Sequence, residues 1–234
     1  MVIKADLHIH TCLSPCGSLE MAPSAIAQAA KQANLDLVSI ADHNSALNCP
    51  AFSDACKKEG LWAMFGLEVT SLEEAHLLCV FETVDKALEF GELIYSKLPE
   101  FPNNPEVLGD QVYVDSNDDI IGEVEKYLGN ATELSIDEIR EEVFSRSGLF
   151  IPAHIDKPVF SITSQLGFLP DDIYTAIEVF FPASAGKYSD KYSVITSSDA
   201  HFLDDIGKKY FTVDIAEKTF LSVLLAMREK KSLI

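Results

Sequence analysis

The chain has 234 residues, 47% of them hydrophobic, which is enough for one large domain with a substantial core. Its formal net charge of −19 should repel polyanions, so we expect neither long nucleic acid nor an anionic membrane as a partner. No apolar run is long enough to cross a bilayer and no export signal opens the chain, so we expect a cytoplasmic protein.

The first predicted element is a strand that starts near Met1 and ends in Asp6-Leu7-His8-Ile9-His10-Thr11. Alternate side chains of a strand share one face, so Asp6, His8 and His10 are expected to point the same way. Two imidazoles one residue apart can bind one metal ion without backbone strain, and Asp6 could orient a ligand imidazole from behind. This stretch therefore predicts the start of a metal site.

Helices and strands then alternate. The sequence predicts a helix over 24–33, a strand over 35–40 followed by His43, a helix over about 51–59, and a strand over 61–67 followed by Glu68. This order is typical of a parallel barrel or an open α/β sheet, in which the active site lies at the carboxyl ends of the strands.

The next strand, over 76–81, begins only eight residues after Glu68, too soon for a helical crossover. A connection this short predicts a hairpin, so the strand should run antiparallel to its predecessor. A strand that runs the other way begins where its neighbour ends. We therefore expect His76 on the same rim as Glu68.

A helix over 84–98 precedes the least regular part of the chain. We interpret residues 1–234 as a single domain with an inserted irregular segment, about 99–133, that contains a hairpin over 111–115 and 120–124. The insertion is either a surface loop or a lid or oligomer contact. Ser135 and Glu138 form a capping box that opens a helix over 136–147.

The last part of the chain repeats the pattern of a strand followed by polar residues. It comprises a strand over 148–153 followed by His154, a strand over 175–181 that contains Glu178, a strand over 192–198 followed by Asp199 and His201, a strand over 210–214, and a helix over 218–230.

The carboxyl-end side chains are too many for one tetrahedral ion. Two to three divalent ions are the natural number, and Glu68 is the best candidate to bridge two of them. Multimetal sites hydrolyse phosphoesters, because the ions generate the nucleophile and neutralise the phosphate charge. The candidate ligands are His8, His10, His43, Glu68, His76, His154, Asp199 and His201.

An ordered set of motifs resembles the PHP (polymerase and histidinol phosphatase) domain family from Met1 to about Gly207. The resemblance implies an α/β fold, a distorted (β/α)7 barrel of PHP type, with a trinuclear metal site and phosphoesterase activity through a metal-bound hydroxide. The motifs are Asp6-Leu7-His8-Ile9-His10-Thr11, Ala41-Asp42-His43, Gly66-Leu67-Glu68-Val69, His76, Pro152-Ala153-His154 and Ser198-Asp199-Ala200-His201.

The resemblance also implies how the ligands are shared. One ion would be held by His8, His10, Glu68 and Asp199; a second by Glu68, His76 and His154; and a third by His43 and His201. Glu68, Asp199 and His201 are the catalytic candidates.

One residue departs from the family pattern. The family usually places an Asp or His a few residues after the paired histidines, and here Cys16 stands at or next to that position. A thiolate ligand would favour zinc or iron over manganese or magnesium. Alternatively, Cys16 is not a ligand and water completes the shell. Lys157 could bind a phosphate oxygen, or it is an ordinary surface lysine.

We therefore expect a metal-dependent phosphoesterase with two to three divalent ions (zinc, iron or manganese). Its partner would be a small phosphorylated substrate, a phosphomonoester or short nucleotide, with no long nucleic acid. Two alternatives remain: a metal-dependent C–N hydrolase of amidohydrolase type, or a non-catalytic metal-binding regulatory module. The sequence does not predict the oligomeric state.

Overall fold

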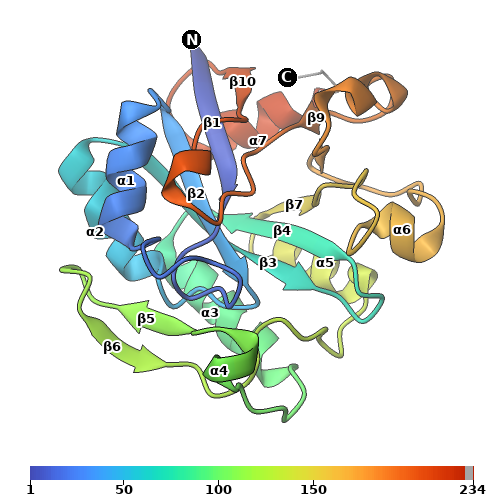
Figure 1. The fold of residues 1–234 in the computed structure, drawn as a ribbon. Helices are drawn as coiled ribbons and strands as arrows, with labels where there is room; N and C mark the ends of the chain where they lie inside the picture. The colour runs from blue at the N-terminus through green and yellow to red at the C-terminus, as the bar shows by residue number, and fades with distance from the viewer. Residues whose placement is uncertain (230–233) are drawn as a thin grey trace.

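The computed structural model describes residues 1–229 and 234, and its centre is a curled six-stranded sheet (Figure 1). The strand order is β10-β1-β2-β3-β4-β7. Neighbours β1, β2 and β3 are parallel, whereas β4 is antiparallel to both β3 and β7, and β10 is antiparallel to β1. The bounds are β1 Val2–Ile9, β2 Leu37–His43, β3 Trp62–Thr70, β4 His76–Phe81, β7 Leu149–Pro152 and β10 Phe211–Asp214.

Backbone hydrogen bonds carry the sheet round from β7 towards β1. The Thr175 N–H donates to the Phe150 carbonyl oxygen over 2.9 Å. Strand β8 (Ile177–Glu178) then pairs in parallel with β9 (Val194–Ile195), and an isolated bridge joins Ile9 to Ala200. The predicted α/β class is confirmed, and this course is consistent with a distorted seven-stranded barrel. The strands predicted over 175–181 and 192–198 are reduced to two residues each, and irregular backbone flanks them.

Helices cover the outer face of the sheet, as the alternating pattern predicts. The five helices predicted from the sequence begin and end within a few positions of their predicted bounds, and the Ser135–Glu138 capping box is present. The helix predicted over 218–230 ends at Arg228, and Lys230 lies outside the described residues. The helices are α1 Pro23–Gln32, α2 Cys49–Glu59, α3 Val84–Ser96, α4 Pro105–Leu108, α5 Ile136–Ser145, α6 Ile162–Leu166, α7 Phe220–Arg228, and the 3-10 helices η1 Pro182–Lys187 and η2 Leu203–Asp205.

Two apolar clusters lie on the two faces of the sheet. The outer cluster joins the sheet to α1, α2, α3 and α5, and includes Phe52 and Phe90. The inner cluster draws alternate residues from the strands and is joined by Phe220 and Val223 of α7. Because apolar side chains fill the inner space below the strand ends, polar side chains at those ends gather in one place.

An irregularity in β1 sets the direction of its histidines. Ile3, Ala5 and Leu7 belong to the inner cluster, but Ile9 belongs to the outer one. The pairing of β1 with β2 shifts register between Asp6 and Ile9. A bulge of this kind re-aims the following side chains, so His8 and His10 point inward. The expectation that Asp6 shares their face is therefore wrong.

The inserted segment contains the predicted hairpin, with β5 (Val112–Val114) antiparallel to β6 (Ile120–Glu123) (Figure 1). It packs on the loop that follows β1. The Val112 N–H donates to the Cys12 carbonyl oxygen over 3.3 Å, and the Val114 N–H donates to the Asn48 side chain over 2.9 Å. None of the helices within residues 1–229 is both long enough and apolar enough to span a bilayer.

Candidate metal centre

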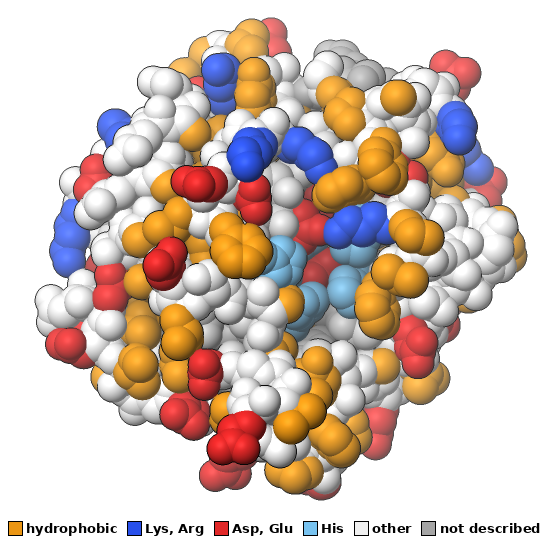
Figure 2. Space-filling model, viewed as in Figure 1, with side chains coloured by type: hydrophobic (Ala, Val, Ile, Leu, Met, Phe, Trp, Pro, Cys, Tyr) orange, Lys and Arg blue, Asp and Glu red, His pale blue; other side chains and the backbone are white. Residues whose placement is uncertain are grey.

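The strand ends bring the predicted ligands together at one hollow of about 120 Å³, whose lining includes six of them: His43, Glu68, His76, His154, Asp199 and His201. His8 lies near the end of β1, His10 directly follows that strand, His43 closes β2, and Glu68 lies near the end of β3. Antiparallel β4 places His76 opposite Thr70 at the same rim, as the short connection predicts. Figure 2 shows histidines at the floor of this hollow, with Lys and Arg side chains along one rim. The other ligand candidates follow β7 and β9: His154, Asp199 and His201.

Four ligand atoms surround a common point at the end of β1. Nε2 of His8 lies 3.2 Å from Nε2 of His10, and each lies 3.3 Å from Oδ1 of Asp199. The Glu68 carboxylate lies 3.4 Å from His8 Nε2 and 3.5 Å from His10 Nε2. Ligand atoms about 2.0–2.2 Å from a tetrahedral ion lie roughly 3.3–3.6 Å apart. These side chains fit one divalent ion.

Glu68 also faces a second group of imidazoles. Its Oε1 lies 2.9 Å from His76 Nδ1 and 3.0 Å from His154 Nε2. Its Oε2 lies 3.2 Å from Nδ1 of His43, a buried atom with no hydrogen-bond partner among the described residues. A buried polar nitrogen without a partner is costly unless it binds a ligand. Glu68 is therefore placed to bridge two ions.

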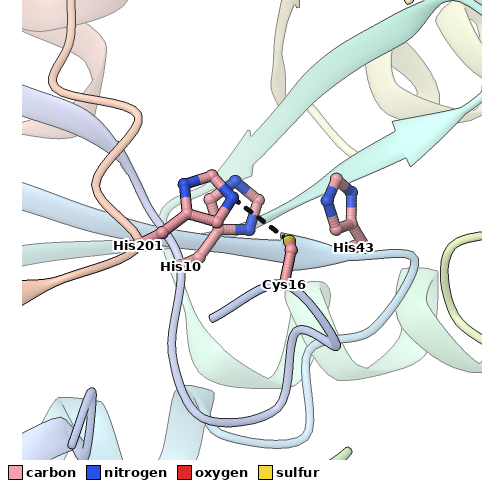
Figure 3. Close-up of side chains that lie close together, drawn as sticks. All are labelled: His10, Cys16, His43 and His201. Atoms are coloured by element: carbon pink, nitrogen blue, oxygen red, sulfur yellow. Dashed lines mark hydrogen bonds between the residues drawn. The ribbon is translucent and has the colours of Figure 1, made fainter. Parts of the chain in front are cut away.

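The third group contains the cysteine that departs from the family pattern. The ligand atoms of His10, Cys16, His43 and His201 all lie within 4.8 Å of one another. Figure 3 shows them converging, with Cys16 Sγ 3.1 Å from Nε2 of His201. Loss of solvent around the Cys16 thiol, together with the negative charge of Glu68, raises the pKa of this thiol to about 12. A metal bound there must displace the thiol proton.

Opposing charges set the protonation of the cluster. Burial would raise the pKa of Glu68, but the charges of His76 and His8 hold it well below its usual range. Burial likewise opposes ionisation of Asp199, yet His8 and a hydrogen bond from His10 lower the pKa of that carboxyl. Burial lowers the pKa of His10 to about 4. Both carboxylates are therefore ionised and His10 is neutral near pH 7, the forms that bind metal.

Glu178 supports two of the candidate ligands from behind. Its Oε2 accepts a hydrogen bond from His8 Nδ1 over 3.0 Å and another from the backbone N–H of His154 over 2.9 Å. Because His8 donates through Nδ1 to Glu178, its Nε2 is the ring nitrogen turned towards the cluster, and a metal would bind there by displacing the Nε2 proton. The sequence alone left Glu178 with two readings, a support for a ligand or a buried partner of a basic side chain.

Ser14 and Asp42 form a second support that sequence reasoning missed. Ser14 Oγ accepts a hydrogen bond from His10 Nδ1 over 2.9 Å and donates to Asp42 Oδ1 over 2.7 Å. The backbone N–H of His43 donates to the same Ser14 Oγ over 3.1 Å. The only signals were a serine in the loop after the paired histidines and an aspartate directly before His43.

Asp6 has a different role from the predicted one. Its Oδ1 accepts hydrogen bonds from the backbone N–H of His8 over 3.3 Å and of Ser198 over 3.1 Å, so it contacts no imidazole. It ties β1 to the segment that carries Asp199. Lys157 lies in the hollow's lining and contacts the Asp199 carboxylate.

Comparison with known proteins identifies the family. A sequence model of the PHP domain matches residues 6–149, more than half of the chain. The chain belongs to the PHP domain family. Members of this family and its fold include metal-dependent phosphoesterases, which agrees with the histidine and carboxylate cluster. Comparison with curated protein sequences gives no significant match.

Solved structures share the PHP fold. The lesion-specific endonuclease Q of Pyrococcus furiosus superposes with a TM-score of 0.68 at 22% identity, over 97% of this chain and 56% of the endonuclease. An endonuclease Q complex with a 27-mer duplex superposes with a TM-score of 0.66 at 20% identity, and the coverage of both chains is the same. A protein of Bifidobacterium adolescentis assigned as a metal-dependent phosphoesterase superposes with a TM-score of 0.59 at 19% identity. The match covers 87% of this chain and 88% of that protein. The chain thus spans just over half of the endonuclease.

The endonuclease Q complex corrects the prediction about partners. That protein holds duplex DNA with an abasic lesion at its active site, so the exclusion of long nucleic acid in favour of a small phosphorylated substrate is wrong. The prediction rested on the net charge of −19. Salt screens charges that lie more than about 8 Å apart, so the net charge does not determine the electrostatic field at the site.

Proposed function

We propose that this PHP domain is a metal-dependent phosphoesterase that cleaves a phosphoester bond in a nucleic-acid strand. The observation that carries the proposal is the ligand spacing at the hollow, where five imidazole nitrogens lie 2.9–3.5 Å from the Glu68 carboxylate oxygens. The endonuclease Q complex supports nucleic acid as the substrate class. Residues 1–234 would act as one catalytic unit, with the insertion over about 99–133 packed beside it.

The proposed centre holds two to three divalent ions. His8, His10, Glu68 and Asp199 would bind the first. His76 and His154 would share Glu68 for the second. A third would be bound by His43, Cys16 and His201, and the thiolate would favour zinc or iron there. When bound, the ions supply nucleophile activation and neutralise the charge of the phosphate.

The chain's own side chains position these ligands and the substrate. Glu178 and Ser14 fix the rings of His8 and His10, each through the ring nitrogen that faces away from the cluster. Lys157 lies beside Asp199 and would contact a phosphate oxygen. The hollow is too small for a stacked duplex, so the reacting phosphate must come from a strand end or from a distorted position.

Hydrolysis of defined phosphoesters tests the proposal. The metal-replete protein should cleave duplex DNA with one abasic site or single-stranded DNA, and a chelator or Asp199→Asn should abolish cleavage. Zinc, iron and manganese would be compared. Failure to release any product from DNA or from p-nitrophenyl phosphate with each metal would overturn the proposal. Hydrolysis of an amide in place of phosphoesters would establish the C–N alternative.

A further inference from the structure

Two lysines from distant parts of the chain meet over one aromatic ring at the rim of the hollow. Lys157 lies three residues after His154, and Lys209 lies two residues before the first residue of β10. Their Nζ atoms lie 4.7 Å and 2.9 Å from the centroid of the Phe180 ring. We call Lys157 and Lys209 the lysine pair.

The ring under the lysine pair is fixed by the backbone. The N–H groups of Phe180 and Phe181 donate to the Asp156 carboxylate over 2.7 Å and 3.0 Å. Asp156 directly precedes Lys157, so one residue anchors the aromatic turn next to the lysine. Cation–π contacts then hold both ammonium groups at this position. The arrangement is a built feature of the rim, not a chance approach of two long side chains.

The lysine pair has an unbalanced charge. Lys157 contacts Asp199, but no carboxylate within residues 1–229 lies at ion-pair distance from Lys209 Nζ. Burial lowers the pKa of Lys209, and the charge of Lys157 adds to this effect, while Asp199 opposes it. Two ammonium groups that contact one ring repel each other. An anion bound beside both of them would offset this repulsion.

The positions of the two lysines relative to the hollow indicate which anion they would bind. Lys157 lines the hollow together with Asp199, whereas Lys209 lies beyond its lining. The ions proposed at Glu68 and Asp199 would neutralise the charge of a phosphate in the hollow. A strand that leaves the hollow past Lys157 would bring its next phosphate to Lys209.

We infer that the lysine pair binds the phosphate adjoining the scissile one, so that the site selects substrates with at least two phosphate groups in a strand. This inference rests on the proposed function and adds Lys209 as a substrate-binding residue. Lys208 is the matched control: it adjoins Lys209, its side chain is 64% exposed, and it pairs with Asp205 over 2.8 Å. Lys208→Met and Lys209→Met change the net charge equally.

The test compares these variants as metal-loaded proteins on a single-stranded oligonucleotide and on p-nitrophenyl phosphate. Lys209→Met should raise KM for the oligonucleotide about tenfold with little change in kcat. The ratio of kcat/KM for the oligonucleotide over the monoester should fall by a similar factor. The slope of log affinity against log salt concentration should become less steep by about 0.7, because one phosphate contact is lost. Lys209→Arg should restore most of the affinity, and Lys208→Met should match the wild type.

Two results would overturn the inference: equal effects of Lys208→Met and Lys209→Met, or an unchanged ratio between the two substrates in Lys209→Met. Binding is followed separately, by fluorescence anisotropy of the labelled oligonucleotide. The wild type could hydrolyse no phosphoester but still bind the oligonucleotide with a salt dependence that falls in Lys209→Met. The proposed function would then fail, but the inference that the lysine pair binds a phosphate would be supported. If the metal-loaded wild type does not bind the oligonucleotide, the inference that the lysine pair binds a phosphate is wrong.

Discussion

A single carboxylate lies at the centre of the site. Glu68 is almost fully buried, and its two oxygens lie within 3.5 Å of five imidazole nitrogens from four segments of the chain. A buried carboxylate is costly unless charges and hydrogen bonds compensate it. Removal of Glu68 would therefore leave several imidazoles without the negative charge that balances bound cations. The five are His8, His10, His43, His76 and His154.

Glu178→Gln tests the support behind the ligands. The amide keeps the size of the side chain but removes the charge that orients His8 Nδ1. We expect about 10–100-fold weaker metal binding, the usual cost of losing such a partner. Metal affinity is measured by competition with a chromophoric chelator. Unchanged affinity would show that Glu178 only fills space in the core.

Cys16 can be tested with cobalt as a spectroscopic probe. If Cys16 binds the third metal together with His43 and His201, cobalt-loaded protein should show a near-ultraviolet thiolate-to-cobalt charge-transfer band. Cys16→Ser should abolish this band. Cys12→Ala is the control, because Cys12 lies in the same loop and is buried beside Val112, away from the ligand cluster. A band that survives in Cys16→Ser would exclude the cysteine as a ligand.

At the scale of elements, the insertion supports the loop that carries Cys16. Gly109, in the insertion, has a φ of +98°, and a Cβ there would collide with the carbonyl oxygen of Pro15. Only glycine allows both the backbone conformation and this close approach. The position of Cys16 thus depends on a segment that contributes no ligand itself.

Gly109→Ala should displace this loop. We expect lower occupancy of the third metal position, measured by elemental analysis, together with a lower melting temperature. Gly60→Ala is the control, because Gly60 has a φ of +68° with nothing within 4 Å of a Cβ. It should cost only backbone strain, about 1 kcal/mol, and leave the metal content unchanged. Equal metal loss in both variants would mean that the loop does not depend on the insertion.

The same scale explains what the sequence predicted and what it did not. The β3–β4 hairpin followed from a connection too short for a helix, so the place of His76 was predictable. The separation of Asp6 from the face of His8 and His10 was not predictable, because strict alternation conceals the bulge between Asp6 and Ile9. Supporting contacts such as Ser14 with Asp42 join a loop to a strand end that only the tertiary fold brings together. Lys209 was missed for the same reason.

For the whole molecule, bound metal should be a main source of stability. Ions that bind the folded state at about 1,000 times their dissociation constant add about 4 kcal/mol per site, which raises the melting temperature of a chain this size by roughly 10 °C. Replete protein should contain between two and three ions per chain by elemental analysis, and His8→Ala or Glu68→Ala should contain fewer. A chelator should lower the melting temperature accordingly. One ion or none in replete protein would refute the multinuclear centre.

The separation of the ligands along the chain has a consequence during synthesis. His8 and His10 are made first, whereas Asp199 and His201 follow after most of the chain. At ribosomal rates of 5–20 residues per second, the interval is on the order of 10–40 s. Throughout it, the nascent chain presents histidines from β1 and β2 without the carboxylate that completes their shell. An ion held by His8, His10, Glu68 and Asp199 could therefore gain its full set of ligands only after the 199–201 segment has docked against β1.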